Sequence, residues 1–220
     1  MIHFNLKNRP AFTMIELVFV IVVLGILASL AMPRLDRDLK QEAADSILSD
    51  IRYTQHLALV DNMHEYDDVK WQQKFWRVVF SNCGSDLFYM VGSDTSKDDS
   101  LSANFALEEA ATDPTNGKPM FNSCGTDNSA YSERIFITNK YGITAVAASN
   151  ACSNNNSNKY IGFDHLGRPH YGFSAATAPD YSSHITSTCT FTFTMSDGDT
   201  FGIEILPETG YAQIVGQDAS

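Results

Sequence analysis

The chain has 220 residues, of which 44% are hydrophobic and 19% are charged, so it can form a packed domain and is not wholly disordered. It carries 26 acidic residues against 15 basic ones, a formal net charge of −11. Because phosphate binding needs a basic surface, this balance argues against a general nucleic-acid-binding protein. The four cysteines form no CxxC pair, so their spacing does not match a common zinc site.

The first predicted element is an apolar helix over residues 12–32, in which Glu16 is the single ionisable side chain. Such a helix would be about 30 Å long, the thickness of the hydrocarbon core of a bilayer. The segment lacks the polar stripe of a core helix, so we predict that it spans a membrane. A secretory signal peptide ending at residues 29–31 (SLA) is the alternative, but it would have a shorter apolar part and no acidic residue near its start.

Glu16 is unusual because an acidic side chain in lipid is costly unless it lies near the interface or has a cationic partner. It could simply lie shallow and reach water. If instead the chain were cut after Ala11, Phe12 would carry a free amine. Phe12 and Glu16 are four residues apart and share one helix face, so the carboxylate could neutralise that amine within one chain or between neighbours.

Residues 11–17 (AFTMIEL), with the apolar helix that follows, resemble the class III signal of type IV pilins and type II secretion pseudopilins. The resemblance implies that a prepilin peptidase cuts between Ala11 and Phe12 on the cytoplasmic side and N-methylates the new amine of Phe12. It also implies that Glu16 directs assembly by meeting the amine of a neighbouring subunit. Ala11 stands where the family usually has Gly, so we expect slower cleavage.

The resemblance also implies an organisation for the whole chain. Residues 1–11 would be the leader peptide, 12–32 the transmembrane and assembly helix, 33–62 an amphipathic stem helix, and 63–220 a globular antiparallel β domain. The protein would be a single-pass protein of the bacterial inner membrane with a periplasmic C-terminal domain, incorporated in a periplasmic or surface filament. Its partners would be prepilin peptidase, other pilin or pseudopilin subunits, an inner-membrane assembly platform and the lipid bilayer, and no cofactor is expected.

After Pro33, apolar residues recur at spacings of three and four up to about Val60, which predicts an amphipathic helix whose apolar face carries the globular domain. The charged residues between them, Asp50 included, are expected to be solvated. From Trp71 onward the period becomes two, which predicts antiparallel strands. We therefore expect an α+β, pilin-like fold with a long N-terminal helix packed on an antiparallel sheet or sandwich. Strands are expected at 74–81 and 87–91, which would pair as a hairpin, and at 134–138 and 143–147, which would form a second hairpin. Further strands are expected at 159–163, 168–173, 188–195, 201–205 and 211–215, with long surface loops at 92–104, 112–128 and 150–158.

Two C-terminal segments resemble those of H-type minor pseudopilins more than those of the major subunits. Residues 163–169 (FDHLGRP) match the hairpin of that subfamily. Residues 209–211 (TGY) correspond to its closing strand but have Tyr in place of Arg.

The sequence shows no catalytic residues, and we expect a protein that is not an enzyme. It has no G-x-S-x-G nucleophile motif, and the His residues at 165, 170 and 184 are interpreted as surface residues near turns. Asp197 and Asp199 are candidate Ca²⁺ ligands, but such a cation needs six to eight oxygens and the segment is first of all a turn. We therefore predict no metal site.

The four cysteines face an oxidising space if the globular domain lies outside the inner membrane, and they allow three pairings. We favour the pairs Cys83–Cys124 and Cys152–Cys189, each worth about 2–4 kcal/mol. Free buried thiols are the alternative, above all for Cys189, which lies on an apolar strand face.

The function predicted from these observations is that of a minor pseudopilin or pilin-like structural subunit of a type II secretion system or a related type IV pilus or competence filament. A DNA-uptake pilin is one alternative, but between residues 160 and 220 Arg168 is the single basic residue against seven acidic ones. Such a surface repels phosphate, so we do not expect nucleic acid as a partner. A secreted soluble binding protein with a signal peptide is the other alternative.

Overall fold

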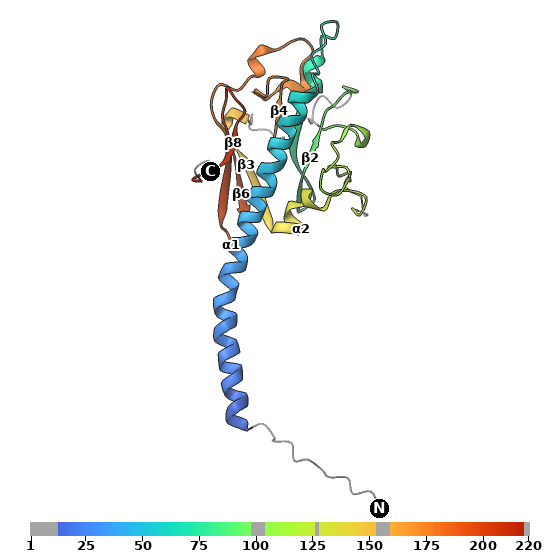
Figure 1. The fold of residues 1–220 in the computed structure, drawn as a ribbon. Helices are drawn as coiled ribbons and strands as arrows, with labels where there is room; N and C mark the ends of the chain where they lie inside the picture. The colour runs from blue at the N-terminus through green and yellow to red at the C-terminus, as the bar shows by residue number, and fades with distance from the viewer. Residues whose placement is uncertain (1–12, 98–103, 126–127, 153–158, 218–220) are drawn as a thin grey trace, which may run out of the picture. The chain divides into compact units, whose positions relative to one another are not determined.

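The computed structural model describes residues 13–97, 104–125, 128–152 and 159–217, with the exception of the side chains of residues 29–38. The chain forms two compact units, Met1–Leu39 and Lys40–Ser220. Helix α1 (Met14–Val60) contributes its beginning to the first unit and its end to the second (Figure 1). The helix continues to Val60, where the sequence pattern placed its end.

In the first unit, α1 begins at Met14 and its side chains are exposed as far as residue 28. The predicted membrane span covers residues 12–32, of which Phe12 and the side chains of residues 29–32 lie outside the described part. Within the described part, no helix combines the length and the apolar character that crossing a bilayer requires.

The second unit contains two four-stranded antiparallel sheets, with strand orders β2-β1-β4-β5 and β3-β6-β7-β8. Together with α1 they confirm the predicted α+β class, and the arrangement is consistent with a pilin-like fold. The strands are β1 (Trp76–Cys83), β2 (Asp86–Gly92), β3 (Ile143–Ala148), β4 (Lys159–Phe163), β5 (Pro169–His170), β6 (Cys189–Met195), β7 (Thr200–Ile205) and β8 (Ala212–Ile214). Besides α2 (Ile137–Tyr141), short 3-10 helices lie at Trp71–Lys74, Leu107–Glu109, Glu133–Ile135, Asn150–Cys152, Phe173–Ala175 and Tyr181–Ser183.

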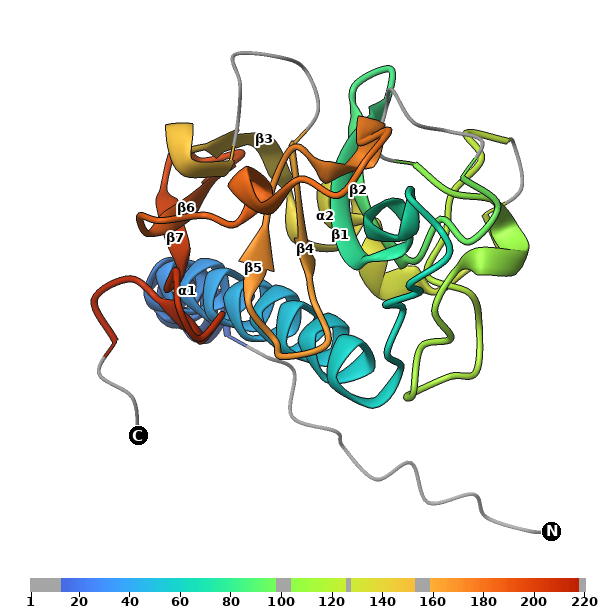
Figure 2. The same ribbon diagram turned by 90° about the horizontal axis from the view of Figure 1, so that it is seen from above.

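The two sheets and residues 40–60 of α1 share one hydrophobic core. This part of α1 lies beside β4, β5 and β7 (Figure 2). Phe80 of β1 packs against Phe191 and Phe193 of β6, with ring centroids 5.0 and 5.5 Å apart. Full burial of such a side chain stabilises the fold by about 1.5–3 kcal/mol. The helix adds a stripe at spacings of three and four, formed by Ala43, Ala44, Ile47, Leu48, Ile51 and Ala58.

Most of the predicted strands are present, and β6 is the clearest of them. Its residues Cys189, Phe191, Phe193 and Met195 are buried, as the alternation with threonine predicted. The hairpin of β1 and β2 is also confirmed. Its turn contains Gly84 at a positive φ of 64°, a conformation that favours glycine.

One predicted hairpin is wrong. The segment 134–138, expected as a strand, instead ends a 3-10 turn and begins the short helix α2, and only β3 forms where its partner was expected. Gly142, at φ 72°, terminates α2, and its N–H donates to the carbonyl of Thr138 (2.8 Å). A glycine in this conformation is the usual end of a helix, so it was a helix-stop signal here and not a hairpin signal.

The predicted strand at 168–173 is much shorter than expected, and the long loops are not simply surface loops. The strand β5 is only Pro169–His170. The loop that follows β2 folds back on it, since the N–H of Val91 donates to Met120 and the carbonyl of Val91 accepts from Ala111. This covers the edge of the sheet and buries polar loop residues such as Asp113. Parts of all three loops (98–103, 126–127 and 153–158) lie outside the described residues.

Two disulfides are present, Cys83–Cys124 and Cys152–Cys189, each with a Cα–Cα distance of 5.5 Å. They are the two pairs that the sequence analysis favoured. Cys152 and Cys189 are fully buried, so this bond ties the 3-10 turn after β3 to the first residue of β6 inside the core.

Candidate functional site

The first candidate site is the beginning of α1. The carbonyl and the hydroxyl of Thr13 both accept the N–H of Glu16, at 3.1 and 3.3 Å. Thr followed three residues later by Glu is the pattern of a capping box. The Glu16 carboxylate lies in the first turn, where the helix dipole favours a negative charge. Thr13 therefore caps the first turn of α1, and the charge of Glu16 suits its position in that turn, besides any role in assembly.

The helix surface around Glu16 is apolar and exposed. Among residues 13–28, Glu16 is the only ionisable residue, and large apolar side chains from Met14 to Leu27 are exposed. Exposed apolar patches of this kind mark surfaces that bind lipid or other proteins. The exposed apolar residues are Met14, Ile15, Leu17, Val18, Phe19, Val20, Ile21, Val22, Val23, Leu24, Ile26 and Leu27.

The two predicted processing residues, Ala11 and Phe12, both lie outside the described residues. The distance between the Phe12 amine and the Glu16 carboxylate is therefore not given by the structure. Cleavage, methylation and the assembly role of Glu16 remain predictions.

A second cluster lies in the turn between β4 and β5 and centres on Asp164. Its Oδ1 accepts the backbone N–H of Leu166 (3.0 Å) and of Arg168 (2.9 Å), and its Oδ2 lies 2.7 Å from Nη2 of Arg168 and 3.3 Å from Nε2 of His170. Burial raises the pKa of Asp164, but the hydrogen bonds from His170 and Arg168 outweigh it and hold that pKa well below its usual range. The carboxylate is therefore a charged centre that holds the turn together.

His170 extends this cluster to Ser183, whose Oγ lies 2.9 Å from its Nδ1. Ser183, His170 and Asp164 thus form a series of side-chain contacts, but the arrangement differs from a catalytic triad. The Ser183 hydroxyl donates to the carbonyl of Asp180 (2.7 Å), Arg168 pairs with the aspartate, and both Ser183 and His170 are buried. The cluster joins β5 to the segment 180–185. Because His170 is buried, the prediction that it is a surface residue is wrong.

The candidate metal residues Asp197 and Asp199 belong to the turn between β6 and β7. Asp197 accepts the N–H of Asp199 (2.8 Å), and Asp199 forms an ion pair with Lys40 (3.2 Å). Over the described residues, no group of three or more His, Cys, Asp or Glu side chains is placed to hold a metal ion.

A third cluster, which the sequence analysis missed, joins α1 to strand β2. Asp50 of α1 accepts the hydroxyl of Tyr89 and pairs with Arg134 (3.0 Å), which also approaches Asp113 (3.5 Å). Asp50 is buried, so the expectation of a solvated charge is wrong. Burial raises its pKa to about 6, although Tyr89 and Arg134 act in the opposite direction. The signal was its position three residues after Ile47, on the buried face.

The comparisons with known proteins concern the first of these sites. Residues 6–32 match the family model of the prokaryotic N-terminal methylation motif. No curated protein and no solved structure matches the chain. The motif supports the assignment of the chain to the type IV pilin and pseudopilin family, whose members are structural proteins, and it implies a membrane-anchored filament subunit processed by prepilin peptidase.

Proposed function

We propose that this chain belongs to the pilin and pseudopilin family and is a minor subunit of a type II secretion system or of a related type IV pilus or competence filament. The observation that carries the proposal is the start of α1, where an exposed apolar surface with one carboxylate coincides with the methylation motif. In this proposal residues 1–11 are removed, Phe12 is methylated, and Glu16 meets the amine of a neighbouring subunit. The second unit then lies on the periplasmic side of the inner membrane.

The physical basis is the apolar surface itself. Burying one large apolar side chain is worth about 1.5–3 kcal/mol, so exposing a dozen of them to water is strongly unfavourable. Lipid can cover them before assembly, and equivalent helices of other subunits can cover them in a filament. A charge pair between the Glu16 carboxylate and an amine would lower the cost of a carboxylate in such surroundings and would fix the register of neighbouring helices.

The second unit fits a structural role. The contact series from Ser183 through His170 to Asp164 is buried and joined to Arg168, and the described acidic side chains do not gather at a metal site. Its aspartates instead close turns and anchor α1, as Asp164 and Asp50 show. These contacts support a rigid domain attached to an assembly helix.

The decisive experiment is intact mass spectrometry of the chain from cells that contain prepilin peptidase. We expect a protein that starts at Phe12 and carries one methyl group, and none of this product in cells that lack the peptidase. Ala11→Gly should give the same product faster, since it restores the residue usual in the family. A mature chain that starts at Met32 would instead show a secretory signal peptide and would contradict the proposal.

Deletion of the gene and complementation then show whether the chain serves a secretion system, a pilus or a competence filament. Loss of the gene should reduce protein secretion, surface filaments or DNA uptake, and only the affected process identifies the machine. If the processed chain is found but all three processes are unchanged, the filament role is wrong even though processing is right.

A further inference from the structure

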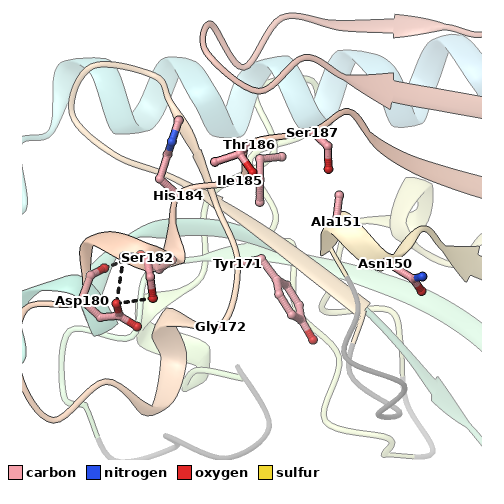
Figure 3. A pocket seen from close by; sticks show the side chains of 11 residues that line it. Asn150, Ala151, Tyr171, Gly172, Asp180, Ser182, His184, Ile185, Thr186 and Ser187 are labelled. Atoms are coloured by element: carbon pink, nitrogen blue, oxygen red, sulfur yellow. Dashed lines mark hydrogen bonds between the residues drawn. The ribbon is translucent and has the colours of Figure 1, made fainter.

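The second unit contains a polar pocket of about 530 Å³ that the proposed filament role does not use (Figure 3). One wall is formed by Tyr171, Gly172, Asp180 and residues 182–185. The other is formed by Asn150, Ala151 and residues 186–187. Both walls consist of short 3-10 turns and loops, so the shape of the pocket depends on the contacts that hold these segments in place.

Buried polar groups hold the first wall. The side chain of Gln72, which is 1% exposed, donates to the carbonyl of Asp180 (3.0 Å) and accepts its N–H. His170 contacts the hydroxyl of Ser183, and the carbonyl of Ser183 accepts the N–H of Tyr171 (2.8 Å). Because a buried polar group is costly unless it is hydrogen-bonded, these contacts keep the segment in one position.

A disulfide holds the second wall. Asn150 lies two residues before Cys152, and Ser187 lies two residues before Cys189, to which Cys152 is bonded. Next to it, Ser149 exchanges two hydrogen bonds with the backbone of Thr190, at 2.9 and 3.0 Å. The two sides of this wall are therefore joined by a covalent bond and by hydrogen bonds, and the pocket is preformed.

The lining of the pocket is rich in hydroxyl groups. Among the described residues that line the pocket there is no Lys or Arg, which disfavours phosphate or carboxylate ligands. The Oδ1 atom of Asp180 already accepts the N–H and the hydroxyl of Ser182, at 2.9 and 2.6 Å. Hydroxyl and amide groups both donate and accept hydrogen bonds, and so they match a ligand that does the same. Such groups come from Tyr171, Ser182, Thr186, Ser187 and Asn150.

Tyr171 adds an aromatic surface to these polar groups. Its ring packs against Tyr160 with a centroid distance of 4.9 Å and projects into the space between Asp180 and Asn150 (Figure 3). A ring with an apolar body and a polar tip suits a ligand with C–H faces and hydroxyl edges. From this combination we propose that the pocket binds a neutral saccharide.

The test uses the full chain in a zwitterionic detergent, because detergents with sugar headgroups would compete for the pocket. Saturation-transfer difference NMR is recorded with maltohexaose, cellohexaose and N-acetylated chitohexaose as neutral probes and with hexagalacturonate as the anionic one. We expect transfer to at least one neutral hexasaccharide and none to hexagalacturonate. Absence of binding to all three neutral probes, or equal binding of the anionic one, would overturn the proposal.

Variants then locate the binding. Tyr171→Ala should weaken it by about tenfold, the value typical of one aromatic contact. The matched control is Tyr181→Ala, which removes a highly exposed tyrosine outside the pocket lining and should leave affinity unchanged. If Tyr171→Ala does not fold, Ser187→Trp decides the question, since it adds a bulky group at an exposed lining position and should abolish binding. Unchanged binding in Ser187→Trp would place the saccharide elsewhere and would refute the inference.

Discussion

The two parts of α1 are made of similar apolar residues but lie in opposite environments. Ile15 is 79% exposed in the first unit, whereas Ile47 and Ile51 are fully buried in the second. Up to residue 28 the described helix is apolar around its circumference apart from Glu16, while from residue 40 onward apolar residues follow one stripe. The stripe is buried by the sheets of the same unit. An all-round apolar surface such as that of the first part is typical of helices that lipid or other proteins cover.

The largest difference in stability should appear when an isoleucine is replaced by alanine in each of the two parts of α1. Ile47→Ala removes fully buried atoms from the core and should lower the free energy of unfolding of the second unit by about 2–5 kcal/mol. Ile15→Ala should leave that free energy unchanged, since its side chain is exposed. Urea unfolding of the full chain, followed by tryptophan fluorescence, measures both, because Trp71 and Trp76 lie in the second unit.

The converse should hold for assembly. Ile15→Ala should reduce incorporation into filaments, measured as the fraction of the chain that co-sediments with other subunits. If Ile15→Ala destabilised the second unit as much as Ile47→Ala does, the division of the helix into two roles would be wrong.

A smaller effect should come from the buried contact between α1 and β2. The pKa of Asp50 is about 6 in the folded protein against 3.8 for an ordinary aspartate, so the folded state binds the proton more tightly. The free energy of unfolding should therefore rise as the pH falls from 7 to 4, by at most about 3 kcal/mol. The lowered pKa of Asp164 acts in the opposite direction, but only below about pH 4.

Asp50→Asn provides the control for this pH dependence. It keeps a hydrogen-bonding group beside Tyr89 and removes the titrating one, so the rise in stability between pH 7 and 4 should disappear. Urea unfolding at several pH values measures this directly. A rise that persists in Asp50→Asn would have to come from another group.

The sequence predicted the elements whose signal is local, and it failed where distant groups decide. The alternation of apolar residues with threonine was sufficient for β6, because one face of the strand is buried along its whole length. The stripe of α1 was likewise found from its spacing. By contrast, the segment 134–138 has an alternation that suits a strand, yet Gly142 and the contact of Thr138 with the backbone of Leu87 (2.9 Å) fix it as the start of a helix.

The partners in the polar clusters were also out of reach of the sequence pattern. The spacing from Ile47 places Asp50 on the buried face of α1, but its partners Tyr89 and Arg134 are far away in the chain and have no recognisable spacing to it. The link from Asp164 through His170 to Ser183 depends on how the segment 180–185 returns to β5. At the start of α1, by contrast, the sequence was more informative than the structure. The motif around Glu16 was found from the sequence, while the structure adds only the capping contact of Thr13.

The smallest effect separates the two roles of Glu16. Glu16→Gln keeps a residue that suits a capping box but removes the charge, so the helix should begin at the same residue. Its incorporation into filaments should nevertheless fall by about tenfold, the consequence of losing a charge interaction of about 1.4 kcal/mol. Thr13→Ala does the opposite, since it removes the capping hydroxyl and leaves the carboxylate in place. If incorporation falls in Thr13→Ala but not in Glu16→Gln, then Glu16 acts through the helix start and not through a charge pair with a neighbouring amine.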